Sequence, residues 1–145
     1  MRKTFKGRPI IPGSMSGEAL VTHQGFNILA TYFRGIADKS PICWDQNNPE
    51  LYQKVLNDKI LCLPKGIGST TGGMFLQCAA DNGIAPLAML YSSHVDSVSV
   101  AGIIMSDVWN GRKIVTIDGL GDEFLAAVQS GDRLTIYEDG TVEIG

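Results

Sequence analysis

The sequence has 145 residues, of which 44% are hydrophobic and 19% charged, with a formal net charge of −3 and a pI near 5.2. These values are typical of one globular domain with a sizeable core, and the acidic balance argues against a nucleic-acid or membrane-surface binder. No apolar run is long enough to cross a membrane, and no signal peptide is visible. We therefore expect a single cytoplasmic domain over residues 1–145 with no nucleic-acid or membrane partner.

The first third of the chain is predicted to be rich in β-structure. Glycine and proline punctuate residues 7–17, which is typical of extended chain and turns. Apolar and β-branched residues predict strands over 18–22 and 27–33. An irregular polar loop follows over 34–49, and residues 49–56 have the pattern of one or two helical turns.

The remainder of the chain alternates strand and helix patterns. Gly83 is well placed to end the first of these helices. Such alternation favours an α/β fold, in which helices cover a parallel or mixed sheet. The predicted order is strand 59–63, glycine-rich turn 65–73, helix 71–82, strand 86–91, helix 95–105, strand 113–117, helix 122–129 and strands 133–137 and 141–144.

The three cysteines do not form a recognisable metal-binding pattern. Cys43, Cys62 and Cys78 are widely spaced and include no C-x-x-C pair. We therefore predict no metal site or complete iron–sulfur ligand set in this chain. Cys62 and Cys78 fall in a predicted strand and helix and are expected in the core, whereas Cys43 lies in a polar loop and is expected to be accessible.

The glycine-rich stretch over residues 65–73 reads Lys-Gly-Ile-Gly-Ser-Thr-Thr-Gly-Gly. It is not a P-loop, because no lysine follows a glycine in the required position. It is not a dinucleotide fingerprint either, because Gly72 follows Gly68 one residue too late. Neither nucleotide-binding interpretation is supported.

This stretch has two remaining interpretations, a capped helix or a ligand site. Backbone N–H groups at a strand–turn–helix junction bind anions. A helix N-cap needs one hydroxyl, and this turn offers three, from Ser69, Thr70 and Thr71. The surplus favours a site for an anionic group. The chain has only two histidines: the His23 pattern indicates a turn, and that of His94 a loop or helix start.

Ser69 alone is predicted to be a poor catalytic base. A serine hydroxyl is less acidic than tyrosine, whose pKa is ~10, so its deprotonation near pH 7 costs more than ~4 kcal/mol. A helix N-terminus contributes at most ~2 kcal/mol toward that cost. Catalysis at Ser69 would therefore need a charged group from outside this chain.

The order of several motifs resembles one protein family, the small subunits of the aconitase X group. The resemblance runs along most of the chain, so it is more specific than any one motif. It rests on Gly7-Arg8-x-Ile10-x-Pro12-Gly13-x-x-x-Gly17-Glu18-Ala19-Leu20-Val21, Lys59-Ile60-Leu61, Gly66-x-Gly68-Ser69-Thr70-x-Gly72 and Gly83-x-Ala85-Pro86.

This resemblance implies a fold and a partner. The fold is the swivelling β/β/α domain of aconitases, a mixed sheet or barrel with flanking helices, made as a separate polypeptide. The partner is a large subunit, which forms a heterodimer with this chain and carries the iron–sulfur cluster or metal. No cofactor is expected in this chain, and the active site is expected between the two subunits.

The resemblance also implies a hydro-lyase that removes water from a small hydroxy acid. Ser69 corresponds to the family's general base, which takes the α-proton of the substrate. Gly68, Thr70 and Thr71 are then expected to contact the substrate carboxylate or hydroxyl. Ser14 is expected to approach from a second loop of small residues.

Two substrates are implied for this family, mevalonate 5-phosphate and cis-3-hydroxy-L-proline. Archaeal members are expected to carry arginine where this chain has Ile67, and isoleucine has no donors for a phosphate. We therefore predict dehydration of cis-3-hydroxy-L-proline to 1-pyrroline-2-carboxylate, with phosphomevalonate as the alternative and nearby Lys65 as a partial replacement for the arginine. The competing hypothesis is a non-catalytic swivelling domain that only binds a partner or a small carboxylate.

Overall fold

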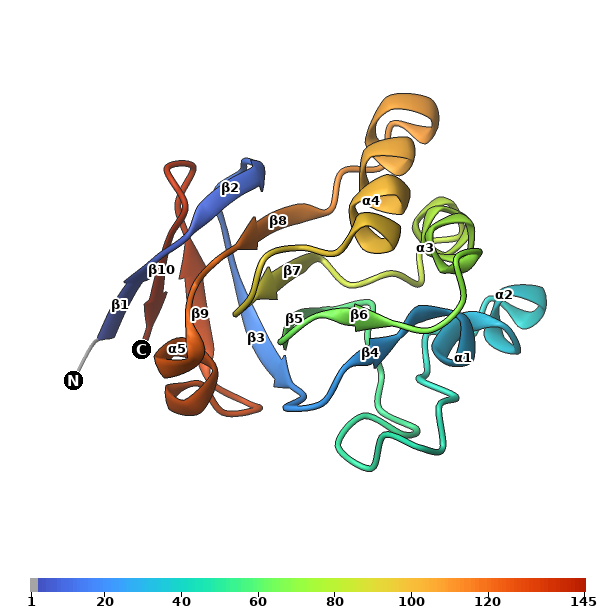
Figure 1. The fold of residues 1–145 in the computed structure, drawn as a ribbon, viewed down its shortest axis with the longest axis horizontal. Coiled ribbons are helices and arrows are strands. Elements are labelled where there is room, and N and C mark those ends of the chain that lie inside the picture. The colour runs from blue at the N-terminus through green and yellow to red at the C-terminus, as the bar shows by residue number, and fades with distance from the viewer. Residues whose placement is uncertain (1–2) are drawn as a thin grey trace.

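A computed structural model describes residues 3–145, which form one large mixed sheet with helices packed against it (Figure 1). This arrangement confirms the predicted α/β fold with a mixed sheet and flanking helices. The elements are β1 (Lys3–Lys6), β2 (Arg8–Ile11), β3 (Met15–Val21), β4 (Phe26–Asn27), α1 (Ile28–Tyr32), α2 (Gly35–Asp38), β5 (Lys59–Leu63), β6 (Gly66–Ile67), α3 (Gly72–Asp81), β7 (Ala88–Tyr91), α4 (Ser97–Asn110), β8 (Val115–Asp118), α5 (Asp122–Ala127), β9 (Arg133–Ile136) and β10 (Thr141–Ile144).

The large sheet has the strand order β1-β10-β9-β3-β5-β7-β8-β2. Its centre, β3-β5-β7-β8, is parallel, and the outer pairings are antiparallel. The two edge strands are consecutive in the chain, with only Gly7 between them, so the sheet must curl toward closure. The Gly7 N–H also donates to the Gly140 carbonyl at 2.9 Å. This curvature gives the molecule its barrel-like half.

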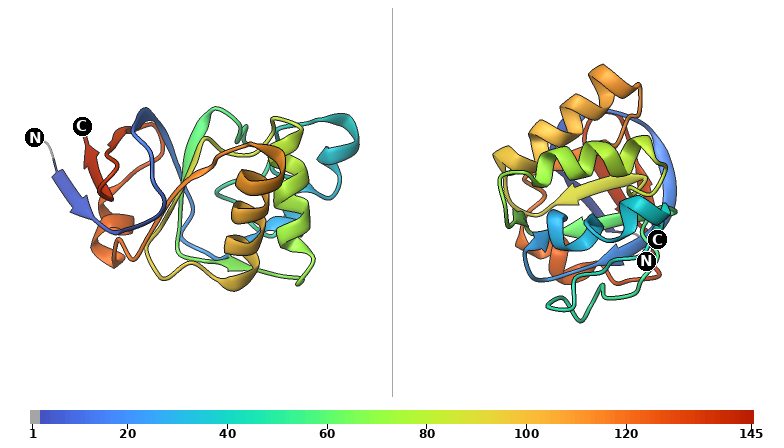
Figure 2. Two further views of the ribbon diagram at one scale, coloured as in Figure 1. Left: turned by 90° about the horizontal axis from the view of Figure 1, so that it is seen from above. Right: turned by 90° about the vertical axis from the view of Figure 1, so that its right-hand side faces the viewer.

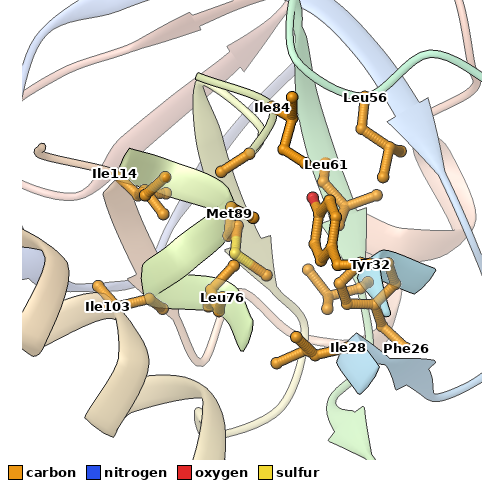
Figure 3. Packing of buried hydrophobic residues seen from close by; sticks show 14 of the residues in the cluster. Phe26, Ile28, Tyr32, Leu56, Leu61, Leu76, Ile84, Met89, Ile103 and Ile114 are labelled. Atoms are coloured by element: carbon orange, nitrogen blue, oxygen red, sulfur yellow. The ribbon is translucent and has the colours of Figure 1, made fainter. Parts of the chain in front are cut away.

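The two innermost strands, β5 and β7, are almost entirely apolar because both of their faces are buried. Alternate residues of β5 enter separate cores: Leu61 faces the helices, and Ile60 faces the inside of the curled sheet. Figure 3 shows the first core, where Leu76 of α3 and Met89 of β7 pack with Tyr32 and other buried side chains. The sheet is therefore fixed from both sides, which positions the loops at its carboxyl end.

Helices α3 and α4 lie side by side, away from the two chain termini (Figure 2). Glycines allow their backbones to approach closely. A Cβ atom on Gly73 would lie 2.7 Å from the Val98 carbonyl oxygen and 3.2 Å from the Gly102 nitrogen. The two helices therefore pack with their backbones in close contact, which places the loops that precede them side by side.

The predicted strand over 27–33 is wrong. Only Phe26 and Asn27 form a strand, β4, and the following residues form helix α1. The Asn27 side chain accepts a hydrogen bond from the Ala30 N–H at 3.0 Å, which caps the helix. Ile28 and Tyr32 are four residues apart and both buried on the same face. Capping and helical burial together outweigh the strand propensity of these residues.

Other predicted boundaries also shift. Residues 3–6 and 8–11 form β1 and β2, and β3 begins at Met15 rather than at residue 18. The helical turns predicted over 49–56 reduce to isolated turns, in which the Leu51 and Tyr52 N–H groups donate to the Asn48 carbonyl, because Gln53 then adopts a left-handed φ of 66°. Gly83 follows α3 with a φ of 75°, as expected for its end.

Two of the three cysteine predictions are wrong. Cys43 is fully buried, with its Sγ 3.6 Å from the Thr31 hydroxyl, whereas Cys78 lies on the exposed side of α3. Cys62 is buried in β5, as predicted. Burial raises the pKa of both the Cys43 and the Cys62 thiols. The polar loop after α2 folds inward at Cys43, which its local sequence does not indicate.

Candidate functional site

The glycine-rich loop lies at the carboxyl end of the central parallel strands, between β5 and α3 (Figure 1). Two neighbouring segments hold it in place. The Gly66 N–H donates to Asp96 Oδ1 at 2.8 Å, and Ile67 pairs with Asn27 in the small parallel sheet of β4 and β6. The loop is therefore a fixed part of the fold.

The loop needs glycine where these neighbours approach it. A Cβ on Gly66 would lie 2.7 Å from Asp96 Oδ1, and one on Gly68 would lie 2.6 Å from Asn27 Oδ1. Gly68 also has a φ of 104°, which favours glycine. Asn27 caps α1, Asp96 caps α4, and α3 begins at Gly72. Three helices thus begin around this loop, where backbone dipoles favour negative charge.

Ser69 lies exposed at the tip of this loop. Its Oγ is 2.9 Å from the Thr71 Oγ1 and accepts from the Thr71 N–H at 3.2 Å. Thr71 is the N-cap residue of α3, but its own side chain makes no capping bond. Among residues 3–145, Thr71 is the only hydrogen-bond partner found for the Ser69 hydroxyl, so no acid or base of the described chain activates it.

The structure brings the predicted loop residues together but not Ser14. Gly68 and Thr70 adjoin Ser69 on the exposed loop. Ser14 precedes β3, whereas Ser69 follows β5, and these strands are parallel, with Glu18 opposite Lys59. Ser14 therefore lies at the amino end of the strands and Ser69 at the carboxyl end. The expectation that the Ser14 loop approaches Ser69 is wrong for this chain.

Ser69 borders a pocket of about 330 Å³. Sequence reasoning missed two residues that line this pocket, Arg34 and Trp44. The Arg34 guanidinium lies 4.6 Å from the centre of the Trp44 ring. Both come from the segment after α1, which was predicted only as an irregular polar loop over residues 34–49. The other residues that line the pocket are Asn27, Leu29, Ala30 and Phe33.

A larger pocket, of about 430 Å³, lies away from this site, beside His23 and Glu50. His23 Nδ1 is 2.6 Å from Glu50 Oε2, and the Thr22 hydroxyl donates to Glu50 Oε1 at 3.0 Å. Burial raises the pKa of Glu50, but the hydrogen bonds from His23 and Thr22 outweigh it and lower the net pKa. His23 lies in a bend after β3, as predicted, where the pair with Glu50 ties two loops together.

A second charged pair, also missed from the sequence, fixes the loop before α4. Arg8 Nε and Nη2 donate to the two oxygens of buried Asp118 at 2.9 and 2.8 Å, and the Val95 N–H donates to the same carboxylate at 2.7 Å. Burial raises the pKa of Asp118, but the Arg8 and Val95 bonds outweigh it, so the pKa is lowered. His94 lies in this loop, as expected, and its electrostatic interaction with Asp118 is a smaller contribution to the lowered pKa of that carboxyl.

The described chain offers little for a metal or a membrane. Within residues 3–145, no group of three or more His, Cys, Asp or Glu side chains is arranged to hold a metal ion. No helix in this range is long and apolar enough to cross a bilayer. The groups that the described chain offers at the site are the hydroxyls of Ser69, Thr70 and Thr71, backbone N–H groups and the Arg34 guanidinium.

Comparison with known proteins identifies the family. A family model described as the aconitase X swivel domain matches residues 4–144. The chain belongs to the aconitase X swivel domain family. Similar proteins include the phosphomevalonate dehydratase small subunits of Aeropyrum pernix (28% identity over 140 residues; 97% of this chain and 92% of that one) and Archaeoglobus fulgidus (30% over 141 residues; 97% of each).

Structural comparison agrees with this assignment. The crystal structure of Thermococcus kodakaraensis aconitase X in its holo-form aligns with a TM-score of 0.81 and 26% identity. The alignment covers 99% of this chain and 98% of that one. The swivelling-domain fold expected from the sequence motifs is thus confirmed, and the relatives in A. pernix and A. fulgidus are named as small subunits of a dehydratase.

Proposed function

We propose that this chain is the small subunit of an aconitase X-type hydro-lyase and that Ser69 is its general base. The observation that carries the proposal is the position of Ser69, exposed on a fixed glycine loop at the start of α3. The family match along residues 4–144 supports the reaction class. Exposure of the hydroxyl suits a residue that meets a substrate bound between two subunits.

In the proposed reaction, Ser69 Oγ takes the proton from the α-carbon of a hydroxy acid. The C–H electrons form a carbon–carbon double bond, the C–O bond to the neighbouring hydroxyl breaks, and the hydroxyl leaves as water after protonation. The Thr71 N–H already donates to Ser69 Oγ at 3.2 Å, so it would stabilise the deprotonated oxygen. The α3 N-terminus would add at most ~2 kcal/mol of the more than ~4 kcal/mol required near pH 7.

No charged group among residues 3–145 hydrogen-bonds the Ser69 hydroxyl, so we propose that the remaining stabilisation comes from the large subunit of the same dehydratase, in a heterodimer. An exposed apolar surface on α4, formed by Ile104, Met105, Val108 and Trp109, is suited to burial against it. Met105 of this surface also lines a groove between α3 and α4. Thr70 borders the same groove, so the surface is continuous with the Ser69 loop. An iron–sulfur cluster or metal, if used, would be held by that subunit.

Phosphomevalonate is the substrate that we favour. The preference for cis-3-hydroxy-L-proline rested on Ile67 alone, and the small subunits of A. pernix and A. fulgidus are both named for phosphomevalonate. Ile67 is 47% exposed and lacks donors, which keeps hydroxyproline as a second candidate. A cation elsewhere in the site would supply the phosphate contact that Ile67 lacks, so its position bears on the choice between the two substrates.

The test is reconstitution of the chain with its large subunit, followed by assay of both substrates. We expect the complex to dehydrate phosphomevalonate and the separate subunits to be inactive. Activity on cis-3-hydroxy-L-proline alone would overturn the substrate. Absence of dehydration of either compound by an assembled complex with its cluster or metal intact would overturn the reaction class.

A further inference from the structure

The Ser69 pocket contains a guanidinium placed like an anion-binding group. Arg34 and Ser69 border the same pocket of about 330 Å³. Arg34 follows the end of α1, whereas Ser69 precedes α3, so the cation reaches the site from a different segment than the glycine loop. A substrate held at Ser69 therefore lies within the same pocket as this charge.

Arg34 is oriented by an aromatic ring and not by an acid. Its guanidinium carbon lies 4.6 Å from the Trp44 ring centre. No ion pair of Arg34 is found among residues 3–145. Stacking restricts the plane of a guanidinium while leaving the N–H groups at its edge free to donate. By contrast, the Arg8 guanidinium is occupied by Asp118.

The composition of the pocket suits a ligand with an apolar body and an anionic end. Leu29, Ala30 and Phe33 supply apolar wall, and the polar groups are Arg34, the Asn27 side chain, which already caps α1, and Ser69. Among the described residues that line this pocket, Arg34 is therefore the one cation. An oxyanion with two acceptor oxygens matches the paired donors of a guanidinium.

Resting on the proposed function of Ser69, we propose that Arg34 binds the anionic group of the substrate, a phosphate or a carboxylate. Arg34 thereby supplies the charge that Ile67 lacks in the glycine loop. Trp44 acts as a positioning residue, because it contacts the guanidinium and holds its plane. The objection to a phosphorylated substrate, which came from Ile67, then no longer applies.

The test compares Arg34→Gln, Arg34→Lys and the control Arg112→Gln in the complex with the large subunit. Arg112 is an exposed arginine that follows α4 and does not border the pocket. With phosphomevalonate, we expect Arg34→Gln to raise KM by about 10- to 100-fold, the range for a hydrogen-bonded charge, with a smaller change in kcat. Arg34→Lys should be intermediate because an ammonium cannot donate in a paired fork.

Substrates without a phosphate show whether Arg34 binds the phosphate or the carboxylate. If Arg34 binds phosphate, Arg34→Gln and wild type will have the same KM for mevalonate. If it binds carboxylate, Arg34→Gln will also raise the KM for mevalonate and for cis-3-hydroxy-L-proline. An unchanged KM with all three compounds would overturn the proposal. A rise in KM equal to that caused by Arg112→Gln would overturn it as well.

A binding measurement separates this proposal from that for Ser69. Calorimetric titration of phosphomevalonate and, separately, cis-3-hydroxy-L-proline into the Ser69→Ala complex, with and without Arg34→Gln, reports affinity without requiring turnover. A weaker Kd for either compound on adding Arg34→Gln supports the anion-binding role even if Ser69 is not the base. If neither Kd changes, Arg34 does not bind the substrate, whatever the role of Ser69.

Discussion

Asp96 joins the stability of α4 to the shape of the Ser69 loop, so its substitution is a sharp test of the account. One carboxylate oxygen accepts from the Ser99 N–H at 2.9 Å and caps α4, and the other accepts from the Gly66 N–H at 2.8 Å. Loss of an N-cap costs about 1 kcal/mol, and loss of the hydrogen bond to a part-buried N–H costs about 1 kcal/mol more. We therefore expect Asp96→Ala to lower the free energy of unfolding by about 2 kcal/mol.

Urea unfolding followed by far-UV circular dichroism measures this change. Asp107→Ala is the matched control, since Asp107 lies on the same helix and no hydrogen bond or ion pair of its side chain is found among the described residues. It should stay within about 0.5 kcal/mol of wild type. Asp96→Asn should lose about half as much as Asp96→Ala because asparagine caps well but has one acceptor oxygen. Hydrogen exchange at the Gly66 amide should accelerate in Asp96→Ala. Equal stability of Asp96→Ala and Asp107→Ala would refute the reasoning.

Three further predictions follow from burial and charge. Trp109→Glu should raise the Kd for the large subunit by about 30-fold or more. The unfolding midpoint should stay unchanged because the side chain is 74% exposed. An unchanged Kd would place the interface elsewhere. One thiol, that of Cys78, should react with an alkylating reagent in the native chain, and Cys43 and Cys62 should react only in urea. The lowered pKa of Asp118 contributes stability above about pH 5 that is lost as pH falls. Asp118→Asn should therefore have a lower free energy of unfolding than wild type near pH 7 and the same free energy of unfolding in acid. A difference between the two that does not change with pH would contradict this.

Local signals in the sequence were sufficient for the centre of the fold. The strand over 59–63 is an uninterrupted apolar run, and the structure buries it on both faces. The glycine cluster after it marked the turn because Gly68 adopts a φ of 104°, which favours glycine. Gly83 marked the end of α3 for a similar local reason. In each case the property that determines the structure belongs to the residues of the pattern itself.

The missed features depend on contacts between distant segments. The ion pair of Arg8 with Asp118 joins β2 to β8, and no local pattern indicates it. Residues from Asn27 onward fit a strand until the side chain of Asn27 is seen to cap a helix. The misplacement of Ser14 had another cause: its position relative to Ser69 depends on the parallel direction of β3 and β5, which the motif does not reveal.

The central claim is that Ser69 is the general base of a two-subunit dehydratase, and kcat of the reconstituted complex tests it most directly. We predict that Ser69→Ala lowers kcat for phosphomevalonate by about 100- to 10,000-fold, the usual contribution of a general base, without impairing assembly. Ser93→Ala, which removes an exposed hydroxyl from the loop after β7, should leave kcat unchanged. An assembled Ser69→Ala complex that retains the activity of the Ser93→Ala complex would contradict the claim.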